Sequence, residues 1–211
     1  MRLPRLPSTL ALALFLALPA GPRPAGADPG LELNEFLAAP ARDWDGSGTF
    51  SSRDDEWVEL INAGAAPVTL DGFLITDGDS LPRFAPSGTL APGAVLLVTG
   101  RMSFDWEKAN GQPAFGLSLG NTGDAVMLWR VSGADTLLVD SFRYDSHDAA
   151  ADRSVGRAAD GTWQLFDALN PYTGSALPAG NGCAPTPGAA NLCTTTDVRP
   201  VTWGRVKTLY R

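Results

Sequence analysis

The feature that most constrains the fold is a series of short apolar segments, each closed by turn residues. Apolar and polar residues alternate in 31–37 (LELNEFL) and in 56–62 (EWVELIN). Turn dipeptides such as Asp71-Gly72 and Pro92-Gly93 separate these segments from later ones, while helical periodicity is nearly absent. Turn signals roughly every 8–12 residues predict an all-β chain folded as a sandwich or barrel of antiparallel strands.

The composition is that of a loop-rich but folded protein. The chain has 23 glycines and 17 prolines, yet 44% of its residues are apolar, which is enough for a core. The segment 170–187 is rich in Pro, Gly and Ala and is expected to run over the surface.

Residues 1–27 have the features of a secretory signal peptide. Arg2 and Arg5 precede the apolar run 10–18, and Ala25-Gly26-Ala27 fits the small-x-small cleavage rule. The run is shorter than the ~20 residues that a membrane-spanning helix needs, so a retained anchor is the weaker interpretation. The sequence predicts cleavage before Asp28, a secreted, cell-surface or periplasmic protein, and no transmembrane segment in the mature chain.

Cleavage there would leave 184 residues (211 − 27), enough for one domain over 28–193 with a short tail. Because the signal segment carries three arginines and no acids, the net charge of the mature chain is −10 (−7 − 3). An acidic surface disfavours nucleic acid as a partner, since phosphates require a basic footprint.

Cys183 and Cys193 are the two cysteines of the chain. An even number of cysteines in an exported protein favours a disulfide. Closing a loop of about ten residues would contribute roughly 2–3 kcal/mol through chain entropy. A zinc site is improbable here because no histidine lies near either cysteine.

Several motifs follow one another in a definite order. They are LELNEFLA, DDEWVELINAG, APVTLDGFLITD, GTLAPGAVLLV, LGNTGDAVMLW, LLVDSFRY, RSVGRAADGTW and PTPGAAN. The ordered set resembles a bacterial lamin-tail domain over residues 31–191. This resemblance implies an immunoglobulin-like β-sandwich, in which the motifs keep the sandwich closed and form no known active site. Filament or chromatin roles do not carry over, because the coiled-coil rod is missing and an export signal is present.

An acidic, glycine-containing loop precedes the second strand segment. Its oxygen-bearing residues have the spacing of a calcium loop with Gly48 at the bend; they are Asp43, Asp45, Ser47, Thr49 and Asp54. Serines stand where stronger sites have carboxylates, and the last position holds the shorter Asp, so binding would be weak. The alternative is a solvent-exposed loop that is polar because it must turn.

Catalytic chemistry has less support. The single histidine, His147, lies among Asp145, Ser146 and Asp148, but three neighbours in one loop cannot converge as a Ser-His-Asp triad does. We therefore expect a protein that is not an enzyme, with no catalytic residue and no cofactor other than possible calcium. The alternative is a small metal-dependent hydrolase that uses the acidic residues of loop 43–59.

Two tryptophans, Trp44 and Trp106, lie in polar segments that we interpret as loops, whereas Trp57 and Trp129 lie in strands and are expected in the core. Exposed loop tryptophans could stack on a sugar or enter a partner's pocket, and the alternative is that they cover the end of the sandwich.

The tail, residues 194–211, has a net charge of +3 and an apolar helical face of Trp203, Val206 and Tyr210. It either docks on the acidic domain or serves as a recognition tag. The sequence as a whole predicts an exported, non-enzymatic binding or structural module whose partner is a protein, a glycan or an envelope component. A fragment of a surface assembly, joined through a sheet edge, is a further possibility.

Overall fold

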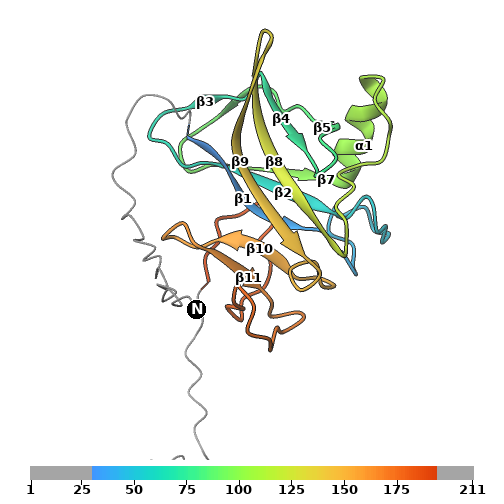
Figure 1. Ribbon diagram of the computed structural model, residues 1–211, viewed down its shortest axis with the longest axis vertical. Coiled ribbons are helices and arrows are strands. Elements are labelled where there is room, and N and C mark those ends of the chain that lie inside the picture. The colour runs from blue at the N-terminus through green and yellow to red at the C-terminus, as the bar shows by residue number, and fades with distance from the viewer. Residues whose placement is uncertain (1–29, 194–211) are drawn as a thin grey trace, which may run out of the picture.

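The computed structural model describes residues 30–193 of the chain (Figure 1). The predicted signal peptide, residues 1–27, and the tail, residues 194–211, lie outside the described residues. Within residues 30–193, the single helix is too short and too polar to cross a membrane.

The fold consists of antiparallel strands and one helix. In chain order the elements are β1 (Leu31–Leu37), β2 (Trp57–Asn62), β3 (Val68–Thr69), β4 (Phe73–Thr76), β5 (Pro82–Phe84), β6 (Thr89–Leu90), β7 (Val95–Thr99), α1 (Gly100–Ala109), β8 (Gly123–Ser132), β9 (Asp135–Asp145), β10 (Ser154–Arg157) and β11 (Trp163–Phe166). The larger sheet has the strand order β11-β10-β1-β2-β7, and the second has the order β5-β4-β8-β9. Strands β3 and β6 form a separate two-stranded pair.

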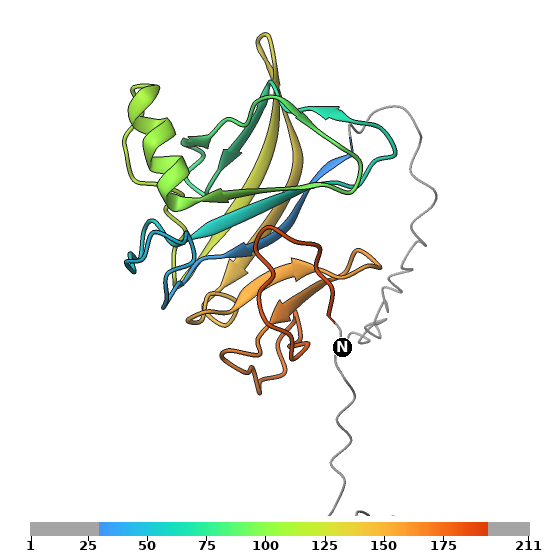
Figure 2. The ribbon, with the colours of Figure 1, turned by 180° about the vertical axis from the view of Figure 1, so that it is seen from behind.

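The two larger sheets pack against each other around one hydrophobic core. The larger sheet contributes Leu33, Leu60 and Val98, and the second contributes Ile75 and Leu128, all of them buried. Figures 1 and 2 show β8 and β9 crossing over the strands of the larger sheet. This confirms the expected all-β fold with antiparallel sheets, and it is consistent with an immunoglobulin-like sandwich.

The turn at Asp71-Gly72 separates two strands, as its sequence predicts. Gly72 has a φ of 85°, which a residue with a side chain rarely adopts. The strands on either side do not form a hairpin, however, because β3 pairs with β6 whereas β4 pairs with β5 and β8. The chain changes sheets at this turn.

Helix α1 corrects the interpretation of the segment around Trp106 as a polar loop. The hydroxyl of Thr99 accepts a hydrogen bond from the Met102 amide at 3.2 Å and caps its first turn. Its buried face is made of Gly100, Ser103 and Glu107, so no apolar periodicity marks it in the sequence. Trp106 therefore lies on a helix and packs against Phe84 of β5, with ring centroids 6.3 Å apart.

The last described segment closes over the outside of the larger sheet. Cys183 and Cys193 form the predicted disulfide, with Cα atoms 5.6 Å apart. The Asn191 amide donates to the backbone carbonyls of Asn34 and Arg157, both at 3.0 Å. Asn191 thus joins the backbones of β1 and β10.

We expect Leu60→Ala to lower the free energy of unfolding by about 2–5 kcal/mol, because Leu60 is completely buried between the sheets. Urea denaturation followed by tryptophan fluorescence measures this. Leu137→Ala is the matched control, because that side chain is 64% exposed and its loss should change stability by less than about 0.5 kcal/mol. Equal losses in the two variants would contradict the assignment of the core.

Candidate functional site

The acidic loop before β2 folds around three carboxylates. Asp43 accepts hydrogen bonds from the backbone amides of Gly46, Ser47 and Gly48 at 2.6–3.1 Å. The buried carboxylate of Asp55 accepts from the amides of Trp44, Asp45 and Ser51 at 2.7–2.9 Å. One oxygen each of Asp43, Asp45 and Asp55 lie within 4.8 Å of one another. The loop is therefore held by its own amides and gathers three negative charges at one place.

The structure places the predicted calcium ligands in two groups. Asp43 and Asp45 belong to the carboxylate cluster, and the Ser47 hydroxyl donates to the Thr49 carbonyl at 3.0 Å within the same loop. Asp54 points elsewhere and forms a two-bond ion pair with Arg53 at 2.6 and 3.0 Å. Hydrogen bonding and charge from Arg53 hold the pKa of Asp54 below its usual value. Its neighbour Asp55 supplies the third carboxylate of the cluster.

A shallow cavity of about 280 Å³ borders this loop. Its lining residues are Ser52, Arg53, Glu56, Phe115, Ser118, Leu119 and Asn121. Glu56 is the acidic residue among them, and its carboxyl accepts a hydrogen bond from the Leu119 amide at 3.2 Å. Burial raises the pKa of Glu56 to about 8. A metal-dependent hydrolase would need several acids converging in a cavity, whereas here the Asp43, Asp45 and Asp55 cluster does not line it.

Two further buried acids lie opposite each other on the larger sheet. Glu35 of β1 is directly opposite Glu59 of β2, and both are at most 1% exposed. The amide of Asn34 and the backbone amide of Gly188 donate to Glu59 at 2.5 and 2.6 Å. Burial raises the pKa of Glu59 to about 7. These acids are therefore enclosed by the chain itself and hold its last segment in place.

Arg83 forms a buried ionic network that the sequence analysis did not detect. Its guanidinium donates to Asp77 at 2.7 Å, to Asp79 at 2.8 Å and to Glu107 of helix α1 at 3.1 Å. Glu107 in turn accepts from the amides of Phe115 and Gly116, both at 2.7 Å. The network fixes the helix and the segment after it. The available signal was an arginine inside a short apolar run, LPRFA.

The two tryptophans considered for ligand stacking are both half-buried. The Trp44 ring meets Trp57 edge to face, with centroids 6.3 Å apart, and its indole nitrogen donates to Asp152 at 2.8 Å. Trp44 thus covers the end of the sandwich over the fully buried Trp57. Trp129 was also expected in the core, but it is only partly buried, because it lies on the outer face of its sheet.

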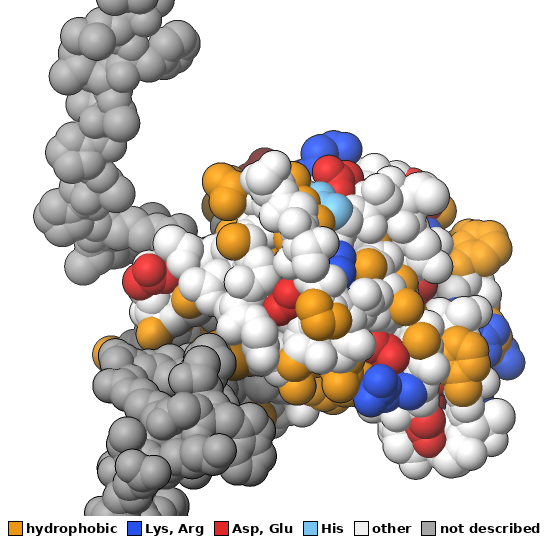
Figure 3. Space-filling view, turned by 90° about the horizontal axis from the view of Figure 1, so that it is seen from below, with side chains coloured by type: hydrophobic (Ala, Val, Ile, Leu, Met, Phe, Trp, Pro, Cys, Tyr) orange, Lys and Arg blue, Asp and Glu red, His pale blue; other side chains and the backbone are white. Residues whose placement is uncertain are grey.

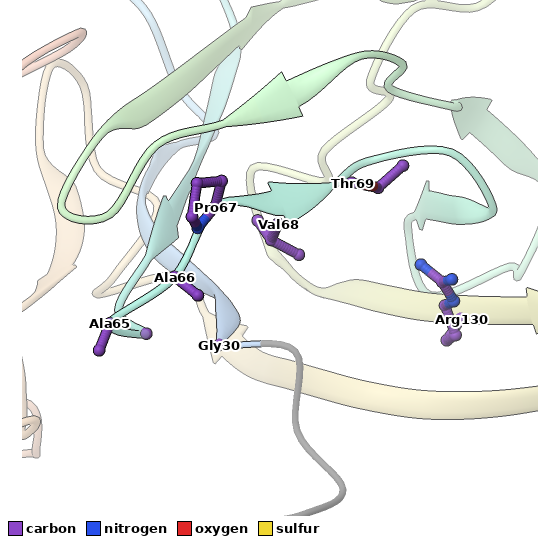
Figure 4. A pocket seen from close by; sticks show the side chains of 8 residues that line it. Gly30, Ala65, Ala66, Pro67, Val68, Thr69 and Arg130 are labelled. Atoms are coloured by element: carbon purple, nitrogen blue, oxygen red, sulfur yellow. The ribbon is translucent and has the colours of Figure 1, made fainter.

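Another cavity lies beside the start of β1. It has a volume of about 410 Å³ and is lined mostly by small side chains and backbone, with Arg130 at one end (Figure 4). The guanidinium of Arg130 stacks on Phe73 at 4.6 Å and so already has a partner. No carboxyl group of the described residues lines this cavity, which gives it no acid–base pair.

The calcium site stays a prediction, and its test is a melting curve. We expect that about 1 mM calcium added to chelator-treated protein raises its melting temperature by a few degrees, since an ion bound only by the folded state stabilises it. Asp55→Asn should remove this shift, because Asp55 is part of the cluster, whereas Asp54→Asn should retain it. A melting temperature that calcium leaves unchanged in the unmodified protein would discard the site.

Stability should decrease as the pH rises from about 5 to 8. The ordinary glutamate pKa is 4.5, whereas Glu56 and Glu59 have pKa values of about 8 and 7 in the folded state. The folded protein then holds more protons than the unfolded chain, so their contribution is full below about pH 4.5 and is lost as the pH passes the folded values. Urea denaturation at the two pH values measures the difference.

Glu56→Gln should flatten this pH dependence, because the amide stays neutral. Asp71→Asn, at an exposed turn position, is the control and should leave the dependence unchanged. The interpretation fails if the unmodified protein is equally stable at both pH values.

Comparison with protein families gives one match. A family model described as Lamin Tail Domain matches residues 24–146, which is more than half of the chain. A search of curated proteins found no match. The matched region contains β1 to β9 and ends within the turn that follows β9. The chain belongs to the lamin tail domain family.

Proposed function

We propose that the protein is an exported, non-enzymatic binding module that acts at the cell surface or outside the cell. The family and the sandwich fold support a module without catalytic function, and the predicted signal peptide supports export. The internal use of the acidic residues also supports it, because Glu35, Glu59 and Glu107 are enclosed by hydrogen bonds from their own chain.

The observation that carries the proposal is an apolar surface on the hairpin of β8 and β9. This hairpin extends beyond the rest of the molecule (Figure 1). Near its tip, Val131 and Leu138 lie on one face of the hairpin and are 38% and 44% exposed, and Leu137 lies on the opposite face and is 64% exposed. Exposed apolar side chains at a projecting tip are better suited to a partner than to solvent.

The apolar surface continues onto the outer face of the second sheet. Leu74, Trp129 and Leu138 are cross-strand neighbours on β4, β8 and β9 and form one row. The indole nitrogen of Trp129 donates to the Thr76 hydroxyl at 3.0 Å, which fixes the ring on this face. A fixed aromatic side chain between two leucines is a rigid contact surface. On the face seen from below, by contrast, acidic and basic side chains are interspersed without one large patch of either sign (Figure 3).

The test is co-sedimentation of the purified mature protein with envelope fractions of the producing cells. We expect Leu137→Asp combined with Leu138→Asp to reduce the bound fraction at least about tenfold, since burying one leucine contributes ~1.5–3 kcal/mol and a tenfold change needs about 1.4 kcal/mol. The matched control is Leu177→Asp, at a leucine that is 82% exposed in the loop after β11. The proposal is wrong if the control weakens sedimentation equally or if the unmodified protein does not sediment.

A further inference from the structure

A second cluster of ion-binding groups lies in the turn after β9, apart from the acidic loop. Asp145, His147 and Asp148 each offer one donor atom, and these atoms lie within 4.8 Å of one another. Unlike the acidic loop, this cluster contains a nitrogen donor, and His147 is the single histidine of the chain. The side chain of Asp145 is 67% exposed, whereas Asp148 is 4% exposed, so the cluster extends from the surface inward.

The contacts of Asp145 determine where the proton of His147 lies. An oxygen of Asp145 contacts Nδ1 of the imidazole and also accepts the backbone amide of His147 at 2.8 Å. A carboxylate can only accept, so Nδ1 carries a hydrogen. In the neutral ring, Nε2 then presents a lone pair. A histidine that binds a metal through one ring nitrogen usually donates the N–H of its other ring nitrogen to a carboxylate or a carbonyl. Here Nδ1 has such a partner in Asp145, and Nε2 is left to bind the metal.

The other side of the ring has unsatisfied polar atoms. Nε2 of His147 lies 3.1 Å from Oδ1 of Asp148, yet neither atom has a hydrogen-bond partner and both are buried. The second oxygen of Asp148 is already used, because it accepts the Asp145 amide at 3.0 Å. Two acceptor atoms that face each other in a buried place repel unless a positive charge joins them. That charge is either a proton or a metal ion.

The charges around the cluster allow a cation. Asp145 and Asp148 supply two negative charges, and Arg153 is the nearby positive group. Its guanidinium is directed at carbonyl oxygens, donating to His147 at 2.5 Å and to Asn170 at 2.6 Å. The Tyr172 ring lies against the imidazole with centroids 5.0 Å apart and holds it in position. The cluster therefore retains a net negative charge and a fixed imidazole.

We propose that Asp148 and Nε2 of His147 bind a divalent transition metal ion, with zinc as the first candidate, and that Asp145 orients the imidazole. One imidazole nitrogen with carboxylate oxygen suits zinc, whereas calcium prefers oxygen donors alone. The site is independent of the proposed binding surface on the hairpin.

The experiment is isothermal titration of zinc chloride into chelator-treated chain lacking only residues 1–27, near pH 7.5, with any affinity tag removed. We expect one zinc ion per chain. His147→Gln should weaken binding at least tenfold, and Asp145→Asn should weaken it about tenfold, as loss of an orienting partner does. The matched control is Asp71→Asn at an exposed turn position outside both acidic clusters, which should bind zinc as the unmodified protein does.

A spectroscopic measurement keeps the proposal testable if a variant does not fold. Because the chain has one histidine, its imidazole signals in the NMR spectrum of the unmodified protein are unambiguous. Zinc should shift them at one equivalent, and calcium should not. The proposal is overturned if zinc does not bind, if His147→Gln binds it unchanged, or if the imidazole signals respond to pH but not to zinc. The last result would identify a proton as the charge between His147 and Asp148.

Discussion

Burial of acidic side chains on the first two strands is the constraint on which the rest of the structure depends. A carboxyl group that is removed from water must find hydrogen-bond donors in the protein. Glu35 obtains them from the hydroxyl of Ser154 at 2.5 Å and from the backbone amide of Thr186 at 3.1 Å, 119 and 151 residues away. Glu59 on the neighbouring strand obtains one from Gly188. The C-terminal part of the domain must therefore close over β1 and β2 before either acid is satisfied.

The same constraint operates at the end of the sandwich next to helix α1. Glu56 accepts the Leu119 amide, and Glu107 accepts the amides of Phe115 and Gly116. The segment between α1 and β8 is thus tied at two points, and Arg83 joins Glu107 to Asp77 across the same end. Buried acids thus hold the segment before β8 at this end and the last described segment over the larger sheet. The apolar tip of the β8–β9 hairpin, which we propose as the binding surface, lies outside these networks.

The sequence predicts strands well where apolar and polar residues alternate, even though β1 and β2 are buried on both faces. Alternation identified β1 and β2, and turn residues identified the breaks before β4 and β7, because these signals are local. Sheet membership is not local, so nothing in APVTLDGFLITD shows that β3 and β4 pair with different strands. Helix α1 escaped detection because its own buried face consists of small and polar residues and leaves no apolar period in the sequence.

Sequence spacing is equally limited in predicting which site residues come together. Counting positions along a calcium loop selects Asp54, whereas the fold turns Asp55 toward Asp43 and gives Asp54 to Arg53. Consecutive residues point in different directions where this loop leads into β2. Spacing along the sequence alone therefore cannot determine which of the two acids faces the cluster. In the turn after β9, the sequence showed His147 among Asp145, Ser146 and Asp148. It could not show that the histidine and Asp148 meet without a hydrogen bond, since that depends on the backbone of the turn.

Hydrogen-bond and packing requirements also define the extent of the domain better than the family match does. The match ends at residue 146, yet β10 pairs with β1, and β11 pairs with β10. Without the residues after 146, Glu35 would lose Ser154 and Thr186, and Phe36 would lose the ring of Trp163, 6.5 Å away. A buried acid without hydrogen-bond donors and an aromatic ring exposed to water would both destabilise the same part of β1. We infer that the cooperative unit extends through Asn191, which follows the last strand in the chain and whose side chain joins the backbones of β1 and β10.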